Sequence, residues 1–297
     1  MSGAGVSDAQ PSQTSSASEP EWMSLVRHPR FREAVERNAA LIVAGKDRMS
    51  PALKWLTNDL GRASTLNRLH ILNAFQSEIT VGDLLARVRI RHTASDGRVI
   101  QILRRAEAAG LVEVEDRAGS WSRRRVVLRT PIFDIFRDRA RSEIESASLV
   151  IPEIQPALDA LVDGEFLVEF MAGFDRFDGV APADRGPPNP GIRHFLMHDA
   201  GLVMLYDLIL QQSPTRARLL EGAPFSRSRL ASRFAVSRTH VRRVFEEAAE
   251  SGLVSFPDRA RIAFSPRISE EAERHFALTF QVVATNALAA LRSSRVS

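Results

Sequence analysis

Hydrophobic residues recur at helical spacing over most of this chain, so the pattern predicts a mainly α-helical protein. Past residue 20, a short turn at Pro29 is expected to precede an amphipathic helix over about 30–43. Ser50 followed by Pro51 is the usual order of an N-cap and a first helical residue, and predicts the start of a second helix. A third helix is predicted over 66–75.

After the third helix the predicted elements follow a defined order. Thr80 is placed to cap a short helix that ends in a polar turn over 89–93, and a longer helix then runs up to Gly110. Two short strands, over 111–115 and 124–129, are predicted to pair around a loop. Helix, helix, helix and hairpin is the order of a winged helix-turn-helix.

The same order returns about 140 residues later. A strongly apolar helix is predicted over 192–212, and Ser226 and Ser237 each precede a further helix. Strands over 253–256 and 261–264 complete a second hairpin.

Two glycines mark corresponding points in these copies. Gly110 and Gly252, each followed by leucine, align at an offset of 142 residues, which also places Val99 on Val241. The short helices that precede them align at an offset of 145 residues. The difference from 142 predicts about three extra residues in the turn of the first copy. We interpret the pattern as an internal duplication of one unit. Chance similarity between two helical segments is the alternative.

The pattern predicts five segments. Residues 1–20 are rich in Ser, Ala and Gln and lack the features of a signal peptide, so a disordered tail is expected. The fourth segment is rich in Gly and Pro and marks the clearest boundary. The segments are the tail (1–20), N-terminal helices with the first winged helix (21–130), a helical connector (131–178), a Gly/Pro linker (179–191), and the second winged helix with a C-terminal helix (192–297).

The fold class expected is therefore mainly α with small β-hairpin wings, arranged as a tandem winged helix-turn-helix. The helices over 131–148, 192–212 and 269–291 are expected to pack the two copies into an intramolecular pseudo-dimer.

Composition excludes several kinds of chemistry. The 297 residues contain no cysteine, which excludes disulfides, cysteine-ligated zinc, iron–sulfur clusters and cysteine nucleophiles. No run of about 18 apolar residues occurs, so we expect a soluble protein, and the absence of cysteine fits a reducing cytoplasm. Glycine-rich nucleotide motifs, serine-hydrolase motifs and HExxH are absent, so neither catalysis nor a cofactor is expected.

His194 and His198 are four residues apart, a spacing that permits zinc binding on one helical face. A pair of this kind in an apolar helix is more often structural, so no metal site is expected.

The net charge of +4 is unevenly distributed along the chain. Residues 84–129 and 214–267 each contain eleven arginines against five acidic residues, a net charge of +6, whereas residues 130–213 carry −8. Two basic units therefore flank an acidic middle. Only Lys46 and Lys54 are lysines, an arginine bias that a GC-rich genome explains as well as phosphate recognition does.

The most specific motif lies in the second basic unit, over 225–256. It contains four short steps: Leu230-Ala231, Val236-Ser237-Arg238, Val241-Arg242 and Gly252-Leu253-Val254. These steps resemble the helix-turn-helix of GntR-type bacterial regulators, and the wing and duplication are similar to MarR-type regulators. The first copy matches either family weakly. The resemblance implies a bacterial DNA-binding transcriptional regulator.

The residues themselves agree with this resemblance. When Val241, Val244 and Phe245 face inward, the opposite face of the same helix presents side chains that contact bases and phosphates in a major groove. A solvated basic face is the alternative. Candidate DNA contacts in the second copy are Arg227, Arg229, Arg233, Ser237, Arg238, Thr239, His240, Arg242 and Arg243, with Arg259 and Arg261 on the wing.

The first copy is a weaker candidate, because Asp96 and Gly97 at the start of its recognition helix reduce phosphate attraction and helix propensity. A degenerate copy that only packs or dimerises is the alternative. Its candidate DNA contacts are Arg91, Thr93, Ser95, Arg98, Gln101, Arg117, Arg123, Arg124 and Arg125.

We therefore expect a transcriptional regulator that is cytoplasmic, associates with the nucleoid and binds double-stranded DNA. Because its recognition helices differ, it is expected to read an asymmetric site. A monomeric pseudo-dimer and a homodimer are both open, and RNA polymerase and a small-molecule effector are further candidate partners. Two other classes remain: a plasmid-type replication initiator with tandem winged helices, and a non-catalytic protein–protein scaffold.

Overall fold

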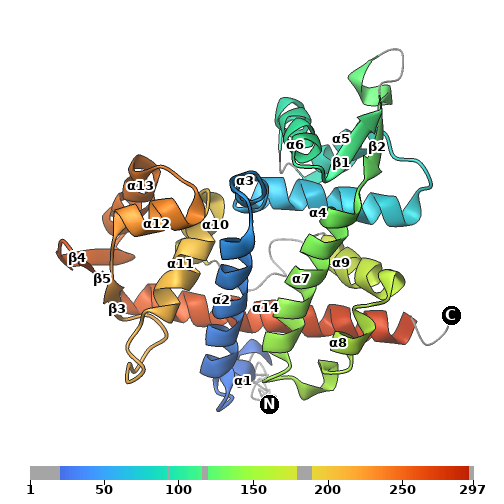
Figure 1. The fold of residues 1–297 in the computed structure, drawn as a ribbon. Helices are drawn as coiled ribbons and strands as arrows, with labels where there is room; N and C mark the ends of the chain where they lie inside the picture. The colour runs from blue at the N-terminus through green and yellow to red at the C-terminus, as the bar shows by residue number, and fades with distance from the viewer. Residues whose placement is uncertain (1–20, 92–93, 116–119, 179–188, 294–297) are drawn as a thin grey trace, which may run out of the picture.

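The computed structural model describes residues 21–91, 94–115, 120–178 and 189–293, in which helices dominate and two small antiparallel sheets are present (Figure 1). A mainly α protein with small β-hairpins is therefore confirmed. Within the described ranges, no helix combines the length and apolar character needed to cross a membrane.

The amino-terminal part of the chain contains α1 (Glu21–Val26), α2 (Phe31–Arg48), α3 (Pro51–Thr57) and α4 (Leu60–Phe75). Of these, α4 is the first of the three helices of the first predicted unit. The Ser50 hydroxyl accepts a hydrogen bond from the Leu53 amide at 3.3 Å, which confirms the predicted N-cap of α3. The Asp59 carboxylate caps α4 through the Arg62 amide at 2.9 Å. Because this cap lies before the apolar positions begin, α4 starts six residues earlier than its hydrophobic pattern indicates.

The first unit contains α5 (Val81–Arg91), α6 (Asp96–Ala108), β1 (Val112–Glu115), a 3-10 turn η1 (Trp121–Arg123) and β2 (Arg125–Leu128). β1 and β2 pair antiparallel, as predicted, and Thr80 adds a single bridge to Arg125. Thr80 also caps α5, because its hydroxyl accepts from the Asp83 amide at 3.2 Å.

The predicted polar turn over 89–93 is wrong in its first part, because α5 continues to Arg91. The equivalent helix of the second copy is α12 (Arg227–Phe234). It is followed by Ala235, whose φ of +56° reverses the chain direction. Most of the extra length of the first copy therefore extends α5 rather than the turn.

The second unit contains α10 (Pro190–Met197), α11 (Gly201–Leu210), β3 (Gly222–Pro224), α12 (Arg227–Phe234), α13 (Arg238–Glu250), β4 (Val254–Asp258) and β5 (Arg261–Phe264). The strands form a sheet in the order β3-β5-β4. The prediction of one helix over 192–212 is wrong, because Ala200, at φ +58°, separates α10 from α11. His198 consequently lies outside the helix in an extended conformation.

Corresponding backbone hydrogen bonds recur in the two units, which supports the duplication. Gly110 and Gly252 end α6 and α13 with φ values of +71° and +67°. The amide after each glycine donates to a carbonyl five residues earlier at 2.9 Å, from Leu111 in the first copy and Leu253 in the second. The turn from the longer helix, α6 or α13, to the hairpin that follows it is therefore built in the same way twice.

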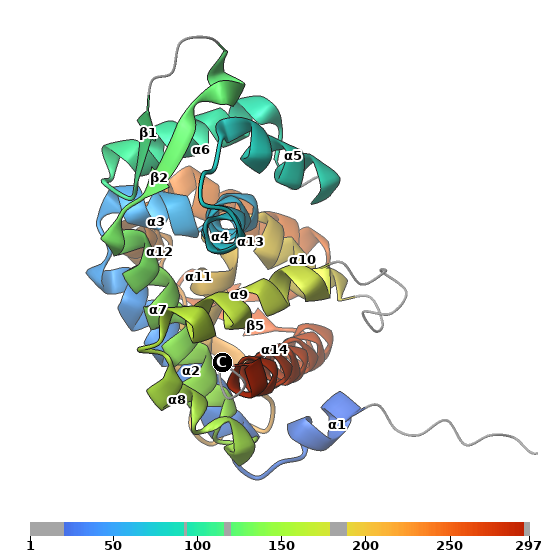
Figure 2. The same ribbon diagram turned by 90° about the vertical axis from the view of Figure 1, so that its right-hand side faces the viewer.

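The remaining helices join the two units into one hydrophobic core: α7 (Thr130–Ala147), η2 (Pro152–Ile154), α8 (Ala157–Ala160), α9 (Gly164–Asp178) and α14 (Pro266–Ser293). Both views place α14 on the other side of α4 from α5, α6 and the β1–β2 hairpin (Figures 1 and 2). It packs against α1, α7, α9 and α10, so one helix contacts segments from most of the chain. α9 crosses α14 closely at Gly173, where an added Cβ would lie 2.2 Å from the Asn286 side chain.

Gly173→Ala should lower the free energy of unfolding by about 1–3 kcal/mol, because the added methyl group overpacks the contact with Asn286. Gly45→Ala is the matched control: Gly45 lies inside α2 with no atom within 4 Å of the added Cβ. That change should be neutral or stabilising by up to about 1 kcal/mol. Urea denaturation measures both, and equal effects would contradict the close crossing.

Candidate nucleic-acid interface

The turn between α12 and α13 is fixed by local hydrogen bonds. The hydroxyl of Ser226 accepts from the Arg229 amide at 3.3 Å, and the hydroxyl of Ser237 accepts from the His240 amide at 3.0 Å, which confirms both predicted N-caps. Between the two helices, the left-handed conformation of Ala235 sets the sharp change of direction. The start of α13 is thereby held in one orientation relative to α12.

α13 has two chemically different faces. Val241, Val244 and Phe245 are fully buried, together with Ala248. The opposite face is exposed and carries Arg238, Thr239, Arg242 and Arg243, with the Ser237 cap also exposed. This is the division that the helical spacing predicts for a helix lying in a DNA groove.

The exposed arginines of α13 make only loose ion pairs. Arg242 lies 3.7 Å from Glu246, and Arg243 lies 3.9 Å from Glu247, with both guanidinium-bearing side chains more than half exposed. Arg227 of α12 likewise lies 3.7 Å from Glu246 and is exposed. Such surface pairs contribute little free energy, so a phosphate or base can replace them at small cost.

The wing of the second unit adds further exposed cations. Arg259 and Arg261 lie at the β4–β5 turn and are both exposed. The Asp258 carboxylate accepts from the Ala260 amide at 2.7 Å and so stabilises the turn that carries them.

Arg229 and Arg233, which the sequence also suggests as phosphate contacts, form internal ion pairs. Asp207 of α11 is almost fully buried and pairs with Arg229 at 2.5 Å and with Arg233. Arg233 also pairs with Asp47 of α2 at 2.5 Å. In the free protein these two arginines therefore anchor α12 to α11 and α2.

His240 is also engaged inside the protein. Its Nε2 hydrogen-bonds to the backbone oxygen of Asp199 at 2.7 Å, and the Asp199 carboxylate pairs with Arg62 of α4 at 2.6 Å. The imidazole therefore ties α13 to the segment between α10 and α11, and through it to the first unit. Its predicted role as a base reader would require this bond to break.

α3 lies between the two units (Figure 1). Toward the second unit, the Lys54 ammonium donates to the carbonyl of Arg233 at 2.8 Å, and the Asn58 amide donates to the carbonyl of Phe234 at 2.9 Å. The opposite contact is made by the Trp55 ring, which packs on arginines of α6. α3 is therefore a spacer between the α12–α13 turn and α6.

Trp55 occupies part of the face that α6 would offer to DNA. The guanidinium carbon of Arg105 lies 3.9 Å from the centre of the indole ring, and that of Arg98 lies 5.6 Å from it. Arg62 contributes a third cation at 4.2 Å. Arg98, a candidate DNA contact, is half-buried beside α3, whereas Gln101 and the Ser95 cap remain exposed.

The first wing is a mixture of exposed and paired cations. Arg123 is exposed, Arg124 packs over Trp121 with its guanidinium carbon 4.4 Å from the ring centre, and Arg125 lies 3.4 Å from Glu115. The side chain of Arg91, and all of Thr93 and Arg117, lie outside the described residues. The unfavourable Asp96 is paired with Arg89 at 2.9 Å.

His194 and His198 meet a third side chain that the sequence did not indicate. Their ring nitrogens and a carboxylate oxygen of Glu247, on α13, all lie within 4.8 Å of one another. His198 Nε2 lies 3.0 Å from Glu247, and His194 Nε2 bonds to the carbonyl of Val244 at 2.8 Å. These bonds join α10 to α13.

No family model, curated protein or solved structure matches this chain.

Asp207→Asn should lower the free energy of unfolding by about 1–3 kcal/mol, because it removes the buried charge that pairs with two arginines of α12. Asp47→Asn is the matched control, since Asp47 pairs with one of the same arginines but its side chain is 41% exposed. Its loss should cost less than about 1 kcal/mol. Chemical denaturation of both variants measures the difference; an Asp207 variant as stable as wild type would contradict the anchoring role.

Proposed function

We propose that this chain is a sequence-specific double-stranded DNA-binding protein that regulates transcription through two winged-helix units. The observation that carries the proposal is the exposed arginine face of α13 opposite its buried apolar face. Arginine binds bidentately to the O6 and N7 atoms of guanine, and each such contact is worth about 1–3 kcal/mol of discrimination.

The second unit is the principal reader in this proposal. Arg238, Arg242 and Arg243 are exposed at the amino-terminal half of α13, and the wing arginines lie on the same unit. The first unit has a weaker surface, because Arg98 is packed beside Trp55. Gln101 and Arg123 remain exposed and support backbone contacts. Unequal recognition helices favour an asymmetric DNA site over a palindrome.

Replacing Arg238 and Arg242 together by alanine should weaken binding to discrete genomic sites by at least about 30-fold, which corresponds to about 2 kcal/mol. Genome-wide footprinting locates the sites, and titration of one duplex gives the affinity. The control is Arg141→Ala/Arg218→Ala, which removes the same charge from exposed arginines outside α12, α13 and both wings. Its affinity should stay within about twofold of wild type.

Three results would contradict the regulator proposal: wild-type protein without discrete sites, equal losses in the two double variants, or affinity independent of salt. Each neutralised phosphate contributes a slope of about −0.9 to log K against log salt. A protein–protein scaffold predicts no such dependence.

Arg98→Ala tests the asymmetric use of the two units. Because Arg98 lies beside Trp55, its loss should change the footprint much less than loss of Arg238 does, with an affinity within about threefold of wild type. Footprinting of Arg98→Ala and Arg238→Ala under identical salt measures the contrast. Equal losses would show that α6 reads DNA as strongly as α13.

A further inference from the structure

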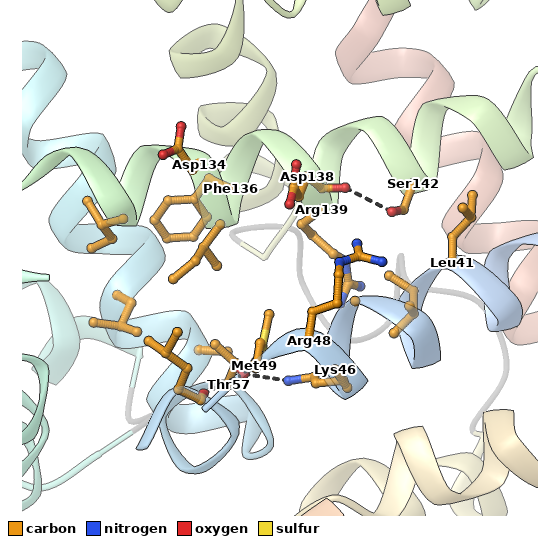
Figure 3. A pocket seen from close by; sticks show the side chains of 17 residues that line it. Leu41, Lys46, Arg48, Met49, Thr57, Asp134, Phe136, Asp138, Arg139 and Ser142 are labelled. Atoms are coloured by element: carbon orange, nitrogen blue, oxygen red, sulfur yellow. Dashed lines mark hydrogen bonds between the residues drawn. The ribbon is translucent and has the colours of Figure 1, made fainter. Parts of the chain in front are cut away.

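A cavity of about 280 Å³ lies between α2, α3, α4 and α7, and no residue of α13 lines it (Figure 3). One part of its wall is apolar and includes Leu53, Leu66, Ile132 and Phe136. Its volume is just below the range of about 300–1,000 Å³ that is usual for small-molecule sites.

The other part of the wall is charged. Lys46, Arg48 and Arg139 line it, together with Asp134 and Asp138. Arg139 pairs with the buried carboxylate of Glu143, and Asp134 pairs with Arg137 at 2.8 Å. All of these lining groups except Lys46 are exposed, and Figure 3 shows Lys46 extending toward Thr57 at the end of α3.

Lys46 is buried, with only 5% of its surface exposed, and no carboxylate of the described residues pairs with it. Its ammonium donates to the Thr57 hydroxyl at 2.5 Å, the one hydrogen-bond partner among the described side chains. Burial of an ammonium group without a counter-ion costs free energy. Near Lys46 are the further cations Arg139, Arg62 and Lys54, with Asp199 as the nearby acid.

Desolvation, with the neighbouring cations, lowers the pKa of Lys46 to about 7. Near neutral pH the amine is therefore partly protonated, and an anion placed beside it would favour the protonated form.

We propose that this cavity binds a small organic carboxylate whose apolar body packs on the α4 and α7 side chains and whose carboxylate pairs with Lys46. The ligand would place a carboxylate directly against the amine, a contact that no carboxylate of the described residues makes. Burial of the amine without a counter-ion is then a cost that binding offsets.

The probe is 3-phenylpropionate, with 3-phenylpropanol and 3-phenylpropylamine as neutral and cationic analogues of similar size. At pH 6.5, calorimetry on the full chain should show the acid binding at least about tenfold more tightly than the alcohol, with no binding of the amine. The affinity of the acid should fall as pH rises above about 7, because Lys46 loses its proton. Equal binding of acid and amine overturns the proposal, as does absence of acid binding.

Lys46→Met should reduce acid affinity at least about tenfold, retain the alcohol affinity, and abolish the pH dependence. Its unliganded melting temperature should equal or exceed that of wild type, because a buried charge is removed, so loss of binding is separable from unfolding. The control Arg141→Met removes an exposed cation from α7 that does not line the cavity. Equal acid affinity in wild type and Lys46→Met overturns the assigned role of the amine.

α3 connects this cavity to the DNA-binding face. Leu53 and Thr57 line the cavity, whereas Lys54 and Asn58 hold the α12–α13 turn. We infer that ligand binding alters DNA affinity, a step that rests on the proposed function. Saturating 3-phenylpropionate should change duplex affinity by about fivefold or more in wild type and not in Lys46→Met. Probe binding with unchanged duplex affinity overturns this coupling; the binding site itself is tested without DNA.

Discussion

The contacts of Asp199 and Ala200 fix how the two units of this protein sit relative to each other. The Asp199 carboxylate pairs with Arg62 of α4 at 2.6 Å, its backbone oxygen bonds to His240 of α13 at 2.7 Å, and the Ala200 amide donates to the carbonyl of Asn58 at 3.0 Å. These bonds exist because the chain leaves the helical conformation between α10 and α11. A continuous helix would satisfy its own backbone groups and leave no carbonyl at this position for His240.

This arrangement divides the arginines into two groups. Arg229 and Arg233 are held by carboxylates of the acidic middle segment and of α2, so they stabilise the position of α12. Arg238, Arg242 and Arg243 are exposed on α13. The internal pairs therefore orient the helix that presents the exposed group, so positive charge along the chain serves both the fold and the proposed DNA contact.

Local sequence signals predicted the elements well where caps and glycines define them. Ser50, Ser226 and Ser237 cap the helices expected of them, and Gly110 and Gly252 end the two longer helices. The hydrophobic pattern did not separate α10 from α11, because apolar residues continue through both helices and Ala200 adopts its left-handed conformation in response to tertiary packing.

Contacts between segments that are distant in the chain could not be predicted from the sequence, because they too depend on tertiary packing. The pairing of Asp207 with α12, the packing of Trp55 against α6 and the approach of Glu247 to His198 all join segments distant in the chain. The spacing of residues within a local segment does not indicate such contacts. Candidate DNA contacts could therefore be named by residue type, whereas their division into internal and exposed groups required the three-dimensional structure.

Hydrogen–deuterium exchange on the full chain tests the central claim most directly. It compares free protein with protein bound to a duplex selected from a random-sequence pool. If α13 is the principal DNA-binding helix, exchange should slow at the start of α13 and in the β4–β5 wing, with smaller changes in α6. Failure to select any duplex, or protection confined to other segments, would contradict it.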